Sequence, residues 1–406
     1  MTGRSPDQLP SLADFIAASP SPFHAAANVR DELLTAGFAD ECLSTPGGHV
    51  LVNGGAVIAW WVPDNPRPRM RVVGSHTDSP GLSVKPDPDL VREGFHQVAV
   101  EVYGGPILST WFDRDITFAG RVVLRDGTHN LVNTGPVARV SSLAIHLYRG
   151  DAPALERQAH TAPILGGGEP FSEVLARAAG VEPGEILAHE LVSADTQRGE
   201  LVGDMLAAGR LDNLSSVWAS LRALLRAKDA ARDVLVLAAF NHEEVGSASP
   251  TGAGGPLLER VLAALAAELG NPAEVFAHSL LVSADAAHSV HPNYPGKHDP
   301  THRPVINGGP VLKINANQRY ASDAVTEAEW KRACAAAGVP VQTFVGNNDV
   351  PCGSTIGPIS ATRLGIPTVD VGVPLLSMHS ARELCGVRDM EWFTDALESF
   401  YRADYR

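Results

Sequence analysis

The stretch Asn241-His242-Glu243-Glu244-Val245-Gly246-Ser247 follows an apolar run, residues 233–240, that is typical of a buried strand. Two adjacent carboxylates at the end of such a strand are costly to desolvate unless a positive charge lies beside them. Neighbouring side chains on a strand point in different directions, so one glutamate can bind a metal ion while the other faces a water molecule or a substrate. This layout suits metal-assisted hydrolysis. The alternative at this point is a solvated turn that carries Glu243 and Glu244.

Length and composition indicate a globular protein of two domains. The chain has 406 residues, 44% hydrophobic and 19% charged residues, and a net charge of −14. Such a length exceeds one ordinary core, and the negative charge argues against nucleic acid and anionic membranes as partners. The N-terminus lacks the apolar core of a signal peptide. The cysteines are far apart and form no CxxC pair, which is typical of reduced thiols in a cytoplasmic protein; they are Cys42, Cys334, Cys352 and Cys385.

The predicted secondary structure changes near residue 81, from helices and strands to strands alone. Residues 11–38 are predicted to be helical with a break at Ser19-Pro20-Ser21-Pro22, and strands are predicted at 56–62 and 70–74. The second of these strands leads into Ser75-His76-Thr77-Asp78. Residues 82–198 then contain strand-like runs separated by Gly and Pro, at 98–103, 116–124 and 137–147. We expect residues 82–198 to form an inserted β-rich domain.

After residue 198, helices and strands alternate to the end of the chain. Helices are predicted at 213–228, 256–269, 355–364 and 389–401, and strands at 234–240, 279–284, 310–315, 341–345 and 368–371. Thr326-x-x-Glu329 has the pattern of a capping box at the start of another helix. The predicted fold class is therefore α/β, with a mixed, largely parallel sheet covered by helices on both faces. We assign this sheet to a discontinuous domain of residues 1–81 and 199–406.

A histidine or a carboxylate follows an apolar strand run, or the exit from one, at five places. They are His76 with Asp78, Asp212, Glu243 with Glu244, Asp285, and His379. Parallel strands end at one edge of a sheet, so these side chains can converge although they are spread over roughly 300 positions. Two histidines and three carboxylates suit zinc, manganese or cobalt, and a carboxylate can bridge two ions.

Each of these residues also has an ordinary structural interpretation. Asp212 precedes a helix and can be its N-cap, and Asp285 can cap a turn. His76 can be a strand-end histidine without a ligand. Asp78 makes a metal ligand more plausible, because a carboxylate beside a ligating imidazole fixes its tautomer. The joint presence of these residues favours a metal site.

At this point the sequence resembles the aspartyl aminopeptidase family of dinuclear metallopeptidases. The matching stretches run nearly end to end: Ser21-Pro-Phe-His24, Gly74-Ser-His-Thr-Asp-Ser-Pro-Gly81, Ser142-Leu-Ala-Ile-His146, Gly209-Arg-Leu-Asp-Asn213, His242-Glu-Glu-Val-Gly-Ser247, His288-x-x-His-Pro-Asn-Tyr294, Gln318-Arg-Tyr-Ala-Ser322, Asn348-Asp-x-Pro-Cys-Gly-Ser-Thr-Ile-Gly-Pro358 and Met378-His-Ser-x-Arg-Glu383. The resemblance implies a zinc-peptidase-like catalytic domain that binds two divalent metal ions, with zinc first and manganese or cobalt as alternatives.

The resemblance also assigns the metal ligands. His76 and Asp285 hold one ion, and Glu244 and His379 hold the other. Asp212 bridges the two ions.

Three further residues take catalytic roles by the same resemblance. Glu243 is the general base, and Asp78 orients a metal-bound histidine. His146 in the β-rich domain reaches the active site of a neighbouring subunit, where it helps to stabilise the tetrahedral intermediate. Without the resemblance, His146 would be interpreted as a strand histidine. The family further implies a homo-oligomer, a dodecamer built from dimers whose subunits pair through the inserted domain.

The expected substrates are peptides with an N-terminal Asp or Glu. An acidic residue needs a fixed cation in its pocket, and Lys313, inside a predicted strand, is the candidate, with Tyr320 and His291 also assigned to substrate binding. The alternative is a lysine on an exposed strand face. Four other functions stay open: a dinuclear aminopeptidase of neutral specificity, a metal-dependent deacylase, a single-zinc hydrolase and a non-catalytic assembly protein.

Overall fold

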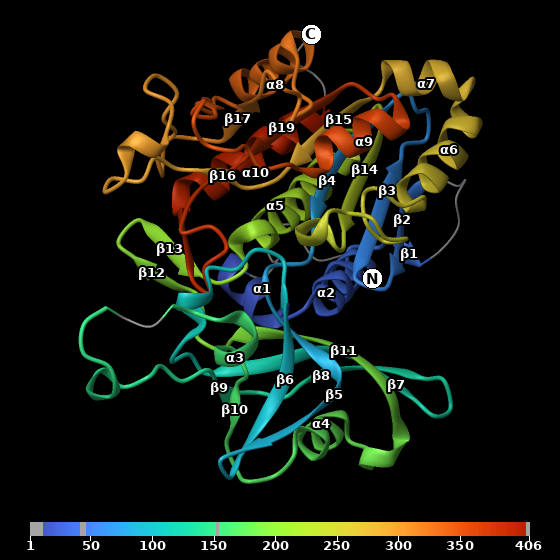
Figure 1. Ribbon diagram of the computed structural model, residues 1–406. Coiled ribbons are helices and arrows are strands. Elements are labelled where there is room, and N and C mark those ends of the chain that lie inside the picture. The colour runs from blue at the N-terminus through green and yellow to red at the C-terminus, as the bar shows by residue number, and fades with distance from the viewer. Residues whose placement is uncertain (1–10, 41–45, 152–153, 403–406) are drawn as a thin grey trace.

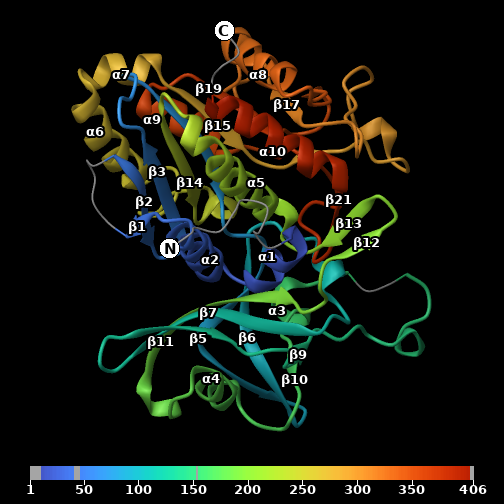
Figure 2. The same cartoon turned by 180° about the vertical axis from the view of Figure 1, so that it is seen from behind.

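The computed structural model describes residues 11–40, 46–151 and 154–402, and these residues form three β-sheets. Figure 1 shows a main sheet wrapped in helices and, below it in this view, a separate barrel of strands. Helices α1 (Leu12–Ala18) and α2 (Pro22–Thr35) lie between the two in the front view and in the view from behind (Figure 2). Cys42 lies outside the described residues. No helix of the described part of the chain is long and apolar enough to cross a membrane.

The main sheet has nine strands among the described residues. In spatial order they are β1 (Ala39–Asp40), β2 (Gly47–Asn53), β3 (Ala56–Val62), β14 (Val234–Phe240), β4 (Met70–His76), β15 (Leu280–Ala284), β19 (Thr368–Gly372), β17 (Val311–Ile314) and β18 (Gln342–Val345). The central strands β14, β4, β15 and β19 are parallel, whereas β3 and β17 run antiparallel to their inner neighbours. The mixed, largely parallel α/β sheet expected from the sequence is confirmed.

Helices cover both faces of the main sheet because its strands alternate between two apolar cores. Leu235, Leu237 and Ala239 of β14 face one core, and Val234 and Val236 face the other. The first core is closed by α1, α2, α5 (Leu211–Ala227), α8 (Ala324–Ala336) and α10 (Val387–Arg402). The second is closed by α6 (Leu257–Leu269), α7 (Pro272–His278) and α9 (Ile356–Leu364).

The second sheet is antiparallel and closes into a barrel. Its strands are β5 (Gly81–Arg92), β6 (Phe95–Tyr103), β7 (Ile116–Leu124), β8 (His129–Asn133), β9 (Ala138–Arg139), β10 (Ile164–Leu165) and β11 (Ile186–Asp195). β11 pairs with both β5 and β7, which closes the ring, and β8 extends it at β7. The barrel has its own core, in which Phe118 packs edge-on against Phe171 of α4 (Phe171–Ala179). A short helix, α3 (Arg157–His160), also belongs to this region.

A third, small sheet lies beside the carboxyl ends of the central strands. It consists of β12 (Glu200–Val202), β13 (Met205–Ala208), β21 (Glu383–Gly386), β20 (Pro374–Leu376) and β16 (Ala287–His288). β20 leads into the loop that carries His379, and β16 follows directly after Asp285. The small sheet therefore fixes two of the loops at the site described below.

Two local predictions are wrong. Residues 137–147 form only the two-residue strand β9, and the 3₁₀ turn Ile145–Leu147 follows in an exposed loop. Leu143 and Leu147 there are 50% and 73% exposed, so the apolar pattern does not mark a strand buried within this chain. Helix α8 begins before Thr326, because Asp323 is its N-cap and forms the capping box with Thr326 as the third residue. The limits 82 and 198 of the inserted domain stay a prediction.

Candidate metal centre

Three adjacent parallel strands bring the predicted site together. β14, β4 and β15 are hydrogen-bonded in that order, and Phe240 at the end of β14 pairs with His76 at the end of β4. Asp285 follows β15 directly, and the 3₁₀ turn Glu243–Val245 follows β14. The convergence expected at the carboxyl edge of the sheet is therefore present. Glu243 and Glu244 lie on a tight turn after His242 (φ +63°) and not on a strand, so strand alternation does not set their directions.

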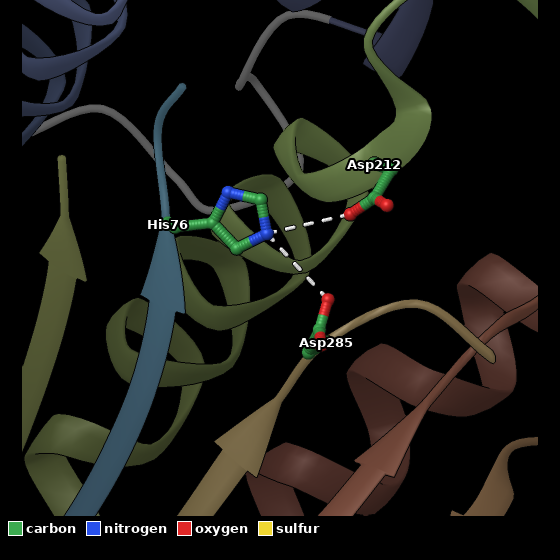
Figure 3. Close-up of side chains that lie close together, drawn as sticks. All are labelled: His76, Asp212 and Asp285. Atoms are coloured by element: carbon green, nitrogen blue, oxygen red, sulfur yellow. Dashed lines mark ion pairs between the residues drawn. The ribbon is translucent and has the colours of Figure 1, made fainter. Parts of the chain in front are cut away.

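The first cluster gathers around the buried imidazole of His76. Its Nε2 lies 3.4 Å from Oδ1 of Asp212 and 3.5 Å from Oδ1 of Asp285. Figure 3 shows the two carboxylates pointing at the same ring nitrogen from different elements, Asp212 from α5 and Asp285 from the end of β15. Glu243 is also near, with Oε2 3.9 Å from the same nitrogen.

The second cluster gathers around His379, which lies in the loop after β20. Its Nε2 is 3.4 Å from Oδ2 of Asp212 and 3.4 Å from Oε2 of Glu244. The two oxygens of Asp212 thus face the two histidines, one oxygen each. Arg210, the N-cap residue of α5, makes no side-chain capping bond, and Asp212 lies within the first turn of the helix. The carboxylate of Asp212 is therefore directed into the site and does not cap the helix.

These residues fit a pair of zinc ions. Two ligand atoms about 2.1 Å from one tetrahedral ion lie about 3.4 Å apart, which is the spacing found here between nitrogen and oxygen. Three-residue groups with ligand atoms close enough to hold a cation include His76–Asp212–Asp285 and Asp212–Glu244–His379, and Asp212 belongs to both. The buried oxygens Asp212 Oδ1 and Glu244 Oε1 accept no hydrogen bond from the described residues.

The electrostatics of the site also favour cations. Burial, helped by the nearby carboxylates of Asp285 and Asp212 and opposed by His76, raises the pKa of Glu243 to about 7. Burial likewise raises the pKa of Glu244. Although burial opposes it, contact with Asp212 and Glu244 raises the pKa of His379 to about 10. Without a bound cation the two glutamates resist ionisation and His379 holds a proton beside Asp212 and Glu244, so positive charge is favoured among these groups.

Asp78 holds the glutamate turn against β4. Its Oδ1 and Oδ2 accept hydrogen bonds from the backbone N–H groups of Glu243 and Glu244, both at 3.1 Å. Its backbone carbonyl lies 3.0 Å from Nδ1 of His76, which must donate because a carbonyl only accepts. In the neutral ring that a metal would bind, Nε2 of His76 is then the unprotonated nitrogen, and it faces the carboxylates.

Glu383, whose role the sequence reasoning missed, links the two clusters. Its Oε1 accepts from the N–H of His379 at 2.7 Å, and its Oε2 accepts from the N–H of Asp212 at 3.0 Å. Burial raises its pKa to about 8. One carboxyl group therefore fixes the backbone of two candidate ligands. Glu383 is the last residue of the motif that contains His379, and this position was the only sign of its role in the sequence.

Lys313 is buried next to the first cluster. Its ammonium lies 3.2 Å from Oδ2 of Asp285 and donates to the carbonyl of Ala286 at 3.1 Å. The exposed-face alternative for Lys313 is therefore excluded, because the residue is 2% exposed. The ammonium lies over the ring of Tyr320, 5.2 Å from its centroid.

A cavity of about 200 Å³ adjoins Lys313. Tyr320 lines it together with His288, which was not singled out from the sequence, and Cys352. His291 is tied to this cavity through His298, whose Nε2 accepts from the His291 N–H at 3.0 Å. Tyr320 and His298, to which His291 is bonded, thus border the same cavity.

His146 lies apart from these clusters in the exposed loop of the barrel region. Ser142 and Leu143 of the same loop line a cavity of about 570 Å³, and Ile145 is 69% exposed. The groups of candidate metal ligands formed by the described residues do not include His146.

Comparison with known proteins agrees with this geometry. A family model described as aminopeptidase I zinc metalloprotease (M18) matches residues 15–401. The chain belongs to the M18 aminopeptidase family. It is therefore a metallo-aminopeptidase, and the resemblance seen in the sequence is confirmed at the level of the family.

Relatives of this M18 chain match it over nearly its whole length. A probable M18 family aminopeptidase 2 from Streptomyces avermitilis is 48% identical over 415 residues, which cover 96% of each chain. The crystal structure of yeast aminopeptidase 1 superposes with a TM-score of 0.84 at 28% identity and covers 97% of both chains. A structure of the S. cerevisiae mApe1 dodecamer gives a TM-score of 0.86 at 28% identity, again over 97% of both chains.

Proposed function

We propose that this M18 member is a dinuclear zinc aminopeptidase that removes an N-terminal Asp or Glu from peptides. The observation that carries the proposal is the position of Asp212, whose two oxygens each face one histidine at 3.4 Å. A bridging carboxylate between two His–carboxylate pairs is the ligand set of a two-metal site. His76 and Asp285 would hold one ion, Glu244 and His379 the other, and manganese or cobalt would fit the same donors.

When bound, the ions would supply Lewis-acid activation of a water molecule and of the peptide carbonyl. Glu243 is assigned as the base. Its Oε2 lies 3.9 Å from Nε2 of His76, and although it forms a further group of possible ligands with His76 and Glu244, it belongs to neither of the two groups that share Asp212. Its carboxylate takes a proton from the attacking water and delivers it to the leaving amine. A pKa of about 7, raised by burial, suits a group that must both accept and donate at neutral pH.

Selection of an acidic N-terminal residue is assigned to Lys313 and the cavity beside it. The ammonium is a buried cation between the metal ligand Asp285 and Tyr320, which lines the cavity. A carboxylate that enters the cavity would share this cation with Asp285. A specific observation favours neutral residues instead: the ammonium already has two oxygen partners, Asp285 and Ala286.

The catalytic unit is proposed to be a dodecamer built from dimers, in which His146 completes a neighbour's active site. Two observations support this. The loop around His146 exposes Leu143, Ile145 and Leu147 although they are apolar, and such contiguous exposure is typical of an interface. The related yeast enzyme forms a dodecamer. A cytoplasmic location stays part of this proposal.

A substrate panel tests the function. The protein is stripped of metal, reloaded with zinc, manganese or cobalt, and assayed on matched Asp-, Glu-, Leu- and Ala-aminoacyl substrates and on N-acyl amino acids. Metal-dependent release of Asp and Glu, with little Leu or Ala, supports the proposal. Preference for Leu or Ala would replace acidic with neutral specificity. Hydrolysis of the N-acyl substrates alone would identify a deacylase.

A further inference from the structure

The segment 103–107, which leaves strand β6 of the barrel, lies directly against the candidate metal ligands. Three hydrogen bonds join it to residues of the site, through the Tyr103 hydroxyl, the Gly105 carbonyl and the Ile107 N–H, and the backbone of Gly104 runs close to Glu244. In Figure 1 the strand β6 runs from the barrel up to the edge of the main sheet. The barrel therefore contributes atoms to the surroundings of the metal site within the same chain.

The carbonyl of Gly105 determines which nitrogen of His379 is available. It lies 3.0 Å from Nδ1 of His379, and a carbonyl only accepts, so Nδ1 carries the proton. In the neutral ring that a metal would bind, Nε2 is therefore the nitrogen with the lone pair, and it faces Asp212 and Glu244. His76 has the same arrangement with the backbone carbonyl of Asp78, supplied by the main-sheet side. Each histidine thus has its tautomer fixed, one of them by the barrel.

The hydroxyl of Tyr103 anchors the residue that holds the glutamate turn. It donates to Oδ2 of Asp78 at 2.7 Å, and the same oxygen accepts from the N–H of Glu244 at 3.1 Å. Asp78 is buried, and its ion-pair partner among the described residues is His76. Loss of the hydroxyl would leave a buried carboxylate with one donor fewer, which costs free energy and loosens its position.

The backbone of the segment approaches the site closely. Gly104 has a φ of +66°, and a Cβ on it would lie 3.2 Å from Cβ of Glu244. The N–H of Ile107 donates to the carbonyl of His379 at 2.9 Å. The segment is therefore fitted against the second cluster, and a Cβ at position 104 would require Glu244 to shift by a few tenths of an ångström.

We infer that segment 103–107 of the barrel is a positioning element for the metal site in its own chain, with Tyr103 as its key side chain. This inference rests on the proposed two-metal site. It gives the barrel a second role besides the proposed assembly. Residues that orient metal ligands by hydrogen bonds commonly change metal affinity by about 10–100-fold when they are removed.

The test compares zinc affinity in Tyr103→Phe and Tyr401→Phe, measured by competition with a chromogenic chelator on the full-length, metal-free protein. Tyr401 is the matched control, since its buried hydroxyl also makes one hydrogen bond, to the carbonyl of Val236, remote from the candidate ligands. We expect Tyr103→Phe to bind zinc at least about tenfold more weakly. Tyr401→Phe should keep the wild-type affinity.

A second pair of variants covers the case in which Tyr103→Phe does not fold. Gly104→Ala presses a methyl group against Glu244, whereas Gly180→Ala has a similar φ of +69° and open space around it. Both bear the same backbone strain, so a loss of zinc affinity in Gly104→Ala alone supports the inference.

The outcomes separate the two levels of the proposal. Wild-type protein that binds fewer than two zinc ions per chain would overturn the proposed two-metal site. Wild-type protein that binds two ions, with Tyr103→Phe and Gly104→Ala at wild-type affinity, would overturn the positioning role of the segment and leave the two-metal site intact.

Discussion

The ammonium of Lys313 lies 3.2 Å from Oδ2 of Asp285, a candidate metal ligand, and is almost fully buried. This pair lies between the candidate metal site and the cavity, because the ammonium lies over the ring of Tyr320, which also lines the cavity. Lys313 can therefore act in two ways. It can select an acidic residue by offering a cation, or it can hold Asp285 in place for the metal.

The two roles of Lys313 are separated by Lys313→Met, which keeps the length of the side chain and removes its charge. As a selector, Lys313 forms a charged hydrogen bond worth about 1.5–3 kcal/mol, so kcat/KM for an Asp substrate should fall about 10- to 150-fold. The value for an Ala substrate should change little. Equal losses on both substrates would reject Lys313 as the selector and would mean that its role is to hold Asp285 in place.

The base is tested with Glu243→Gln. The amide keeps the shape of the side chain but accepts no proton, so turnover should fall about 10²–10⁴-fold while zinc content stays at the wild-type level. Zinc is measured by atomic absorption on the dialysed protein. Glu244→Ala is the control that should lose zinc as well as turnover. Near wild-type turnover in Glu243→Gln would remove Glu243 from the mechanism.

The shared position of Asp212 predicts unequal effects of two alanine substitutions. Asp212→Ala removes a ligand from both clusters and should bring zinc content close to zero. Asp285→Ala removes a ligand from one cluster and should leave about one ion per chain, since Asp212, Glu244 and His379 stay together. Zinc content per folded chain decides the point. Equal retention of zinc in the two variants would argue against a bridging Asp212.

Zinc binding should release protons at neutral pH. Although burial opposes it, contacts with carboxylates raise the pKa of His379 to about 10, so this imidazole is protonated at pH 7 in the metal-free protein. A ligating imidazole must be neutral, and each displaced proton therefore makes the apparent affinity rise with pH, by up to about tenfold per unit. The measurement is a zinc titration from pH 6 to 9, corrected with a chelator of known protonation. A pH-independent affinity would contradict the raised pKa.

The main features of the site could be predicted because its ligands follow strands. His76 and Asp285 each lie at or just after the end of a central parallel strand, and such strands end at one edge of the sheet. The apolar run at 234–240 is recovered as β14 over the same residues. In these cases the local sequence pattern predicts the strand, and the end of the strand already fixes where the ligand lies in the fold.

Other features depend on contacts between distant segments. Tyr103 at the end of β6 and Asp78 in the loop after β4 are 25 positions apart, and Glu383 reaches Asp212 across 171 positions. Nothing in the sequence around Tyr103 or Glu383 marks a hydrogen bond to a backbone or to a second carboxylate. The loop with Leu143 was predicted as a strand for a related reason, since its apolar residues find no cover in the described part of this chain.

The most direct test of the two-metal account is an anomalous difference map at the zinc absorption edge from crystals of the zinc-loaded protein. The account predicts two peaks, one beside His76 and Asp285 and one beside His379 and Glu244. Each should lie about 2.0–2.2 Å from a different oxygen of Asp212. A single peak, or two peaks of which one does not touch Asp212, would contradict it.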